Sequence, residues 1–314
     1  MLAVGALGES WVNKSKPILL SFSTVGCPDW TFDQIIHFAK VHGYNGIELR
    51  GILRELDLVK CPEFNSPDAI AISRKKVEDK GLQIVCLGSS AVLHEPIGLK
   101  RQTNIDEAKR FIDLANALNC TAIRVFPDKF PTEETREKTL QHMSETLLAI
   151  ASFAKGSPVQ VLVETHGELL ESAEILKLMQ SVAGTQTGLV WDIVNMWTKT
   201  NISPAEMYPQ LKPYIKHAHI KNLIRVDGKD RDTLLDKGIA PIFEAIQLLQ
   251  DDGVRRDTRT SADHRGHVVQ RMARGHADRT RCRPSRCRGL HLSWLRSARR
   301  RRLPETDTRV GARL

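Results

Sequence analysis

The 314-residue sequence lacks the long apolar segments that mark membrane-spanning and secreted chains. No stretch reaches the roughly 18 consecutive apolar residues that a membrane helix needs. Residues 1–16 contain no apolar run of about 7 to 15 residues behind a basic start, so a secretory signal is not expected. We therefore expect a cytoplasmic protein without a membrane partner.

Closely spaced cysteines are also missing from the first 253 residues. Cys27, Cys61, Cys86 and Cys120 lie far apart, and no C-x-x-C motif occurs among them. This spacing supports neither a zinc ribbon nor a disulfide framework. We expect these cysteines to be buried thiols.

Lysine is absent after Lys237, although the chain carries a formal net charge of +9. Residues 1–253 contain 28 Lys and Arg against 32 Asp and Glu, a balance of −4. Residues 254–314 contain 18 Arg against 5 acidic residues, a balance of +13. A basic arm for nucleic acid is one interpretation. The scattered His, Pro and Cys residues without periodicity favour another, namely a disordered or out-of-frame tail over 254–314.

What the sequence does contain, before this tail, is a regular alternation of short apolar runs with longer stretches of helical period. This alternation is typical of βα units and a parallel sheet. Ser66-Pro67 and Ser203-Pro204 each place a capping hydroxyl before a first-turn proline, which marks the start of a helix. The expected strands are 18–21, 46–49, 83–87, 122–126, 160–164, 187–192 and 216–220. The expected helices are 31–42, 67–80, 103–118, 132–155, 170–182, 204–212 and 239–251.

Seven such units predict a (β/α)8 barrel of the TIM type, which takes roughly 250 residues as one domain. We assign this domain to residues 17–253, after an N-terminal extension over 1–16. The eighth strand should follow Gly253, but the sequence VRRD that comes next lacks the Val/Ile-rich character of a buried parallel strand. We therefore expect the barrel to lack a proper eighth strand because of an aberrant C-terminus.

Polar residues that end the apolar strands are the candidates for chemistry, because barrel enzymes place their active sites at the C-terminal ends of the strands. Glu164 and Asp192 each end a strand, and His217 and His219 alternate along the next one, on one face. A lone carboxylate after a strand is commonly a helix N-cap. Three metal-competent groups on three successive strands instead predict a divalent-metal site of Glu164, Asp192 and His219. Such ligands suit Mn, Mg, Co or Zn. His217 lies one layer deeper and is favoured as a core or supporting histidine.

Other strand-end residues are candidates for binding a substrate, namely Glu48, Arg124, His166 and Lys221. Arg124 suits two roles equally, as a structural ion-pair partner or as an anchor for substrate oxygens. Glu48 suits an ion pair with Arg50 or Lys221, or a contact with the substrate. The sequence leaves these alternatives open.

Five segments together resemble the sugar phosphate isomerases/epimerases of the xylose isomerase-like TIM barrel superfamily: TVGCPDW (24–30), GIELR (46–50), VETH (163–166), WD (191–192) and HAHIKN (217–222). The resemblance covers about residues 17–253. In that family a Glu, an Asp, a His and a second Glu hold the metal, and the first three match Glu164, Asp192 and His219. The second Glu belongs to a strand-eight motif resembling Glu-Trp-Glu, which this sequence lacks. Asn222 stands where family members often have Asp.

The resemblance implies a divalent-metal-dependent isomerase or epimerase that acts on a sugar or related polyhydroxy carbonyl compound through an enediolate. Glu164 would then serve as both ligand and proton-transfer base. A dehydratase related by fold would use the same enediolate. Nucleic-acid processing of the AP-endonuclease kind is disfavoured, because the early strands lack further histidines and the barrel is acidic. A third hypothesis is that the chain as written is inactive, because a missing strand leaves sheet edges unpaired. The expected partner is a small sugar-like molecule, and a homo-oligomer is left open.

Overall fold

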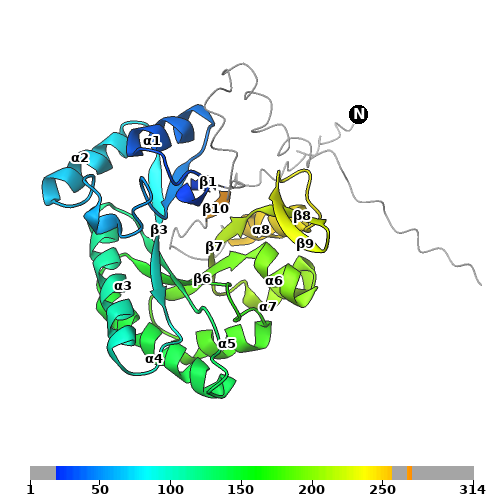
Figure 1. Ribbon diagram of the computed structural model, residues 1–314. Helices are drawn as coiled ribbons and strands as arrows, with labels where there is room; N and C mark the ends of the chain where they lie inside the picture. Colours follow the sequence, from blue (N-terminus) through cyan, green and yellow to red (C-terminus); the bar gives the residue numbers. More distant parts are fainter. Residues whose placement is uncertain (1–18, 257–266, 271–314) are drawn as a thin grey trace, which may run out of the picture.

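The computed structural model describes residues 19–256 and 267–270, and Figure 1 shows them as a barrel of parallel strands inside a ring of helices. The barrel strands are β1 (Leu19–Ser23), β2 (Gly46–Leu49), β3 (Gln83–Val92), β4 (Ala122–Phe126), β5 (Gln160–Glu164), β6 (Thr187–Asp192), β7 (Ile215–Ile220) and β10 (His267–Gln270). They close in the order β1-β10-β7-β6-β5-β4-β3-β2. The TIM-type barrel that the sequence predicted is confirmed.

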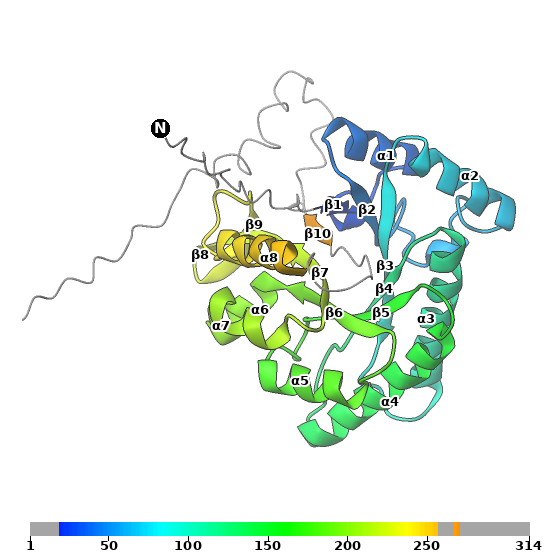
Figure 2. The ribbon, with the colours of Figure 1, turned by 180° about the vertical axis from the view of Figure 1, so that it is seen from behind.

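The helices between these strands lie on the outside of the sheet, as the view from behind in Figure 2 also shows. They are α1 (Phe32–Val41), α2 (Pro67–Glu78), α3 (Leu99–Ala117), α4 (Arg136–Ala154), α5 (Ser172–Ser181), α6 (Ile193–Thr200), α7 (Pro204–Leu211) and α8 (Ile242–Arg256). Short 3-10 turns occur at Thr24–Gly26 and Leu58–Lys60. No helix among the described residues is both long enough and apolar enough to cross a membrane.

Helix starts follow the signals in the sequence. The hydroxyl of Ser66 accepts from the backbone of Ala69, and that of Ser203 accepts from Glu206, each with a proline in the first turn. Such caps satisfy backbone N–H groups that the helix itself leaves without partners. The two starts predicted from Ser-Pro pairs are therefore confirmed.

The strands are buried on both faces, as expected of a parallel sheet covered by helices. One apolar core lies between the strands and the helices and contains large side chains such as Phe22, Phe111 and Trp191. The four described cysteines are buried and form no disulfide, which confirms the expectation for them.

Helix α6 and a hairpin after β7 were absent from the sequence prediction. Helix α6 begins directly after β6, because Asp192 ends the strand and caps the helix at once. The hairpin of β8 (Asn222–Val226) and β9 (Lys229–Thr233) follows β7. Its turn is Asp227-Gly228, both with positive φ (52° and 72°). Asp-Gly is a strong signal for a two-residue hairpin turn, so the sequence did contain the information.

The structure corrects the expectation that nothing after Gly253 takes part in the barrel. Strand β10 lies between β1 and β7, with Leu19 paired to His267 and Val269 paired to His219. Helix α8 also runs to Arg256, past the expected domain boundary. A gap between β1 and β7 would leave two rows of backbone groups without partners, and even a four-residue strand fills it.

The sequence of β10, HVVQ, contains no carboxylate. The glutamate that the resemblance places on the eighth strand is therefore not supplied by this segment. The expectations of an N-terminal extension over 1–16 and of a disordered or out-of-frame tail otherwise lie outside the described residues.

Candidate metal centre

Three neighbouring strands bring the predicted ligands together. Glu164 ends β5, Asp192 ends β6 and pairs in register with His219 of β7. One ligand atom from each lies within 4.8 Å of the others, and all three side chains are fully buried. Glu164 Oε1 lies 3.3 Å from His219 Nδ1. The juxtaposition expected from strand ends is thus present in the fold.

Asp192 is held by contacts with Asn195, Lys221 and Thr165. Its Oδ1 accepts from the backbone N–H of Asn195 at 2.9 Å, and its Oδ2 lies 3.1 Å from Lys221 Nζ. Lys221 also donates to Asn195 Oδ1 at 2.7 Å. The backbone N–H of Asp192 donates to Thr165 Oγ1 at 2.8 Å. Asp192 is therefore also the N-cap of helix α6, and this contact fixes its orientation within the cluster.

Asn195 and Thr165 were not among the residues singled out from the sequence. A signal for Asn195 existed, because an Asp at the end of a strand followed three residues later by a polar side chain is typical of a helix start. Thr165 follows Glu164 directly and had no such signal.

The imidazole of His219 lies between two carboxylates. Its Nε2 is 2.8 Å from Glu48 Oε2, whereas its Nδ1 faces Glu164. The same Glu48 oxygen is 3.4 Å from His217 Nε2. As a result the described residues contain two overlapping sets of metal-competent groups, Glu164–Asp192–His219 and Glu48–His217–His219, which share one ring.

Glu48 pairs with neither of the cations considered from the sequence. Lys221 is engaged by Asp192, and Arg50 donates to Ser90 Oγ at 2.9 Å. Burial by itself raises the pKa of Glu48, but the charge of His219 and the hydrogen bonds from both histidines outweigh it and hold the pKa well below its usual range. Burial also lowers the pKa of His217. Glu48 is thus a buried anion whose ion-pair partners among the described residues are two imidazoles.

Arg124 makes the contacts of a structural ion-pair partner. Its Nε is 3.1 Å from Glu164 Oε2, and its Nη1 donates to the carbonyl of Ser89 at 2.7 Å. The guanidinium lies 3.7 Å from the centre of the Phe126 ring. Gly88 makes room for it, because a Cβ at that position would lie 2.9 Å from Arg124 Nη2. The side chain is only 1% exposed.

His166 and Asn222 lie at the edge of the cluster. The half-buried ring of His166 has its centroid 4.6 Å from that of Phe126. The amide of Asn222 is used by the segment after the hairpin: Nδ2 donates to Leu235 O, and Oδ1 accepts from the backbone of Ala240. Asn222 therefore supports the chain that covers β7.

The donor set fits a divalent ion. Two ligand atoms that are each about 2.0–2.2 Å from one ion lie about 3.0–3.4 Å apart, and the Glu164–His219 distance of 3.3 Å is within that range. Two carboxylates and an imidazole offer hard and borderline donors, which suit Mg, Mn, Co or Zn. One further carboxylate oxygen, Glu48 Oε1, is buried and has no hydrogen-bond partner within the described part of the chain.

Comparisons with known proteins agree with the barrel fold. The family model of the xylose isomerase-like TIM barrel matches residues 36–256. The chain is 24% identical over 199 residues to a 3-dehydroshikimate dehydratase of Bacillus anthracis, which covers 63% of this chain and 68% of that protein. A solved structure of the probable 3-DHS dehydratase of B. anthracis superposes with a TM-score of 0.63 and 20% identity, over 82% of this chain and 94% of that chain. The 3-keto-D-glucoside 4-epimerase of E. coli superposes with a TM-score of 0.64 and 14% identity, over 90% of this chain and 100% of that chain.

Proposed function

The chain belongs to the xylose isomerase-like TIM barrel family, and we propose that it is a divalent-metal-dependent isomerase or epimerase. The substrate class is a sugar or a related polyhydroxy carbonyl compound, and the reaction passes through an enediolate. One observation carries the proposal: Glu164, Asp192 and His219, which end or nearly end three adjacent strands, place their ligand atoms within 4.8 Å of one another.

A divalent ion at these residues would draw electrons from the carbonyl and hydroxyl oxygens of a substrate and make the intervening C–H more acidic, an effect worth several kcal/mol. The residues of the chain supply the remaining chemistry. Glu164 is the proton-transfer base, and Arg124 Nε lies 3.1 Å from its Oε2. We assign Lys221 and His166 to binding the hydroxyl groups of the substrate, and Lys221 also contacts Asp192.

Glu164 is the one proton-transfer base that we assign to the substrate. Two-sided epimerisation needs an acid and a base on opposite faces, and the sequence of β10, HVVQ, contains no carboxylate. A single base that removes a proton from one carbon and returns it to the neighbouring carbon is enough for aldose–ketose isomerisation. Isomerisation is therefore the form of the reaction that these residues support best.

A fold-related dehydratase is the second candidate, favoured by the 24% identity to a protein named 3-dehydroshikimate dehydratase. The first half of that reaction would be the same, with Glu164 removing a proton next to a carbonyl. The second half differs, because the enediolate expels a β-hydroxyl as water and a C=C bond remains.

The test is an exchange experiment in D2O. The full chain with Mn2+ is incubated with ketoses, inososes, hydroxypyruvate-like acids and 3-dehydroshikimate, and 1H NMR follows the C–H signal next to the carbonyl. We expect its loss with one class of compound, and the product signals separate isomerisation from loss of water. Glu164→Gln should abolish the exchange, whereas the exposed Glu133→Gln should keep it. Exchange into none of these compounds, or exchange that persists in Glu164→Gln, would contradict the proposal.

A further inference from the structure

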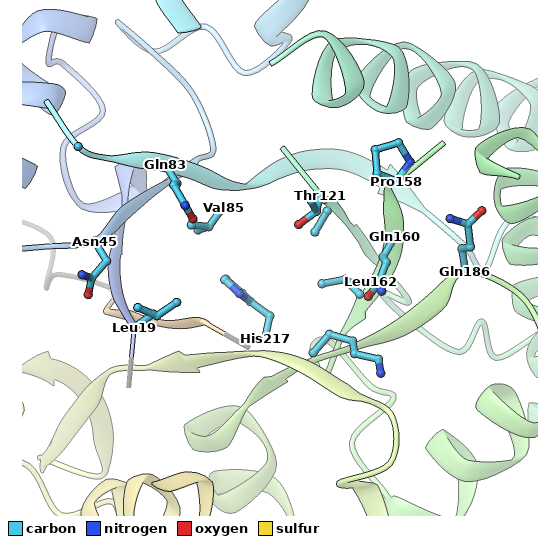
Figure 3. Close-up of a pocket in the computed structure, with 13 residues that line it drawn as sticks. Leu19, Asn45, Gln83, Val85, Thr121, Pro158, Gln160, Leu162, Gln186 and His217 are labelled. Carbon is cyan, nitrogen blue, oxygen red and sulfur yellow. The ribbon is translucent and has the colours of Figure 1, made fainter. Parts of the chain in front are cut away.

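A cavity of about 770 Å³ opens at the N-terminal ends of the barrel strands, away from the ends that carry Glu164 and Asp192. Figure 3 shows its lining, to which the residues that begin or precede the strands contribute. Side-chain amides predominate among its polar groups, namely those of Asn45, Gln83, Gln160 and Gln186. His217, the third residue of β7, is the lining residue closest to the metal cluster along that strand.

His217 connects this cavity to Glu48. His217 is one of the residues that line the cavity, and its Nε2 lies 3.4 Å from Glu48 Oε2. Glu48 Oε2 is also 2.8 Å from His219 Nε2. The second oxygen, Oε1, is fully buried and has no hydrogen-bond partner among the residues that the structure describes.

We propose that Glu48, His217 and His219 form a second divalent-cation site, of the zinc type, which ions and water reach through the N-terminal cavity. Two imidazoles and one carboxylate are a three-ligand set that holds zinc with a fourth position open. Water from the cavity supplies the fourth ligand. This site shares His219 with the Glu164–Asp192–His219 set but takes its other two ligands from Glu48 and His217, and it does not depend on the function proposed above.

The distances suit such a site. Ligand atoms in a tetrahedral zinc site lie about 3.3–3.4 Å apart when each bond is about 2.0–2.1 Å. The His217–Glu48 distance of 3.4 Å already has that value, and the His219–Glu48 distance of 2.8 Å has to open by about half an ångström. The three ligand atoms lie within 4.8 Å of one another, so movements of about an ångström or two would bring them to the spacing of a zinc site.

The buried charge of Glu48 also favours a cation at this site. A buried carboxylate is costly unless a cation compensates it. Glu164 and Asp192 each have a side-chain cation at 3.1 Å, Arg124 and Lys221 respectively. Among the described residues, Glu48 forms ion pairs with His217 and His219 alone. Among the described residues, no Lys or Arg therefore competes with a divalent ion for Glu48.

His219 can serve both sets because it presents a different nitrogen to each, Nε2 towards Glu48 and Nδ1 towards Glu164. When both sets are filled, the ring bridges the two ions and its N–H proton is released to solvent. Release of ligand protons on binding is general for metal sites.

The experiment measures zinc stoichiometry of the full-length chain. Metal-free protein is equilibrated with zinc, dialysed, and analysed by plasma mass spectrometry. We expect His217→Ala and Glu48→Gln each to retain one zinc ion fewer per chain than wild type. Asp192→Asn should lose the ion of the other set and keep the one that depends on His217. The exposed His37→Ala is the matched control, because adventitious binding to histidines would respond to it equally.

Cobalt gives a second readout on the wild-type chain. Four-coordinate cobalt with nitrogen and oxygen ligands absorbs strongly in the visible range, and this band should be weaker in His217→Ala than in wild type. Far-UV circular dichroism checks that each variant folds, and His217→Gln replaces His217→Ala if the latter does not. The proposal is overturned if His217 variants keep the wild-type stoichiometry and cobalt band. It is also overturned if Glu48→Gln weakens one ion without changing the number bound, because Glu48 then only orients His219.

Discussion

Replacing Arg124 by Met tests whether the buried Arg124–Glu164 pair holds the metal cluster together in the absence of metal. The variant keeps most of the side-chain volume but removes the charge 3.1 Å from Glu164, the hydrogen bond to Ser89 and the stacking on Phe126. Breaking a buried ion pair by removing one partner costs about 3–5 kcal/mol, because the other charge stays buried without compensation. We expect the free energy of unfolding of the metal-free chain to fall by this amount.

The protein offers a close control for this variant. Arg136 also pairs with a glutamate, Glu174, at 2.6 Å, and its guanidinium lies 3.6 Å from the Phe130 ring centre. The contacts are of the same kinds, but the Arg136 side chain is 46% exposed. Because exposed ion pairs contribute about 0–1 kcal/mol, Arg136→Met should cost far less.

Urea unfolding of both variants, followed by circular dichroism with and without Mn2+, measures the difference. A divalent ion compensates Glu164 directly, so Mn2+ should restore part of the stability lost in Arg124→Met and little of that lost in Arg136→Met. Equal losses in the two variants, or a loss below about 1 kcal/mol in Arg124→Met, would refute the reasoning that burial makes this pair important.

Three further predictions concern metal, thiols and barrel closure. Glu164→Gln should retain less Mn2+ than wild type on dialysis, whereas Glu133→Gln should match wild type; equal metal content in all three would speak against Glu164 as a ligand. Burial raises the pKa of Cys61 to about 12, so roughly one thiol in ten thousand is ionised at pH 8. Peptide mapping should therefore find slow alkylation of Cys61 in the folded chain and fast alkylation in urea, and equal rates would contradict its burial. A chain truncated after Gln270 keeps β10, whereas one truncated after Arg256 loses it and leaves β1 and β7 without a partner; the second should melt at a lower temperature, and identical melting would show that β10 contributes nothing.

The strands and the first metal-ligand set were predictable because both depend on local patterns. Apolar runs such as 160–164 and 187–192 mark buried parallel strands, and the ends of such strands meet at one end of a barrel. The sequence therefore predicts that Glu164, Asp192 and His219 lie together, and the structure brings them together.

The contact between Glu48 and His219 was not predictable in this way. The two residues are 171 positions apart, and they meet only because β1 and β10 close the sheet between β2 and β7. Such a contact depends on which strand fills the gap and in which register. Strand β10 was missed for a related reason: its four residues follow an arginine-rich segment, and only pairing with β1 and β7 gives them a place in the sheet.

Strand β10 makes the order of synthesis important for this chain. The pairing of Leu19 with His267 joins the first described strand to the last one. At about 5–20 residues per second, β1 emerges from the ribosome roughly 10–50 s before its neighbour in the sheet exists. During that interval the exposed edge of β1 can pair with other chains. Yield in cells should therefore depend on chaperones and on translation speed more strongly than the stability of the finished barrel would indicate.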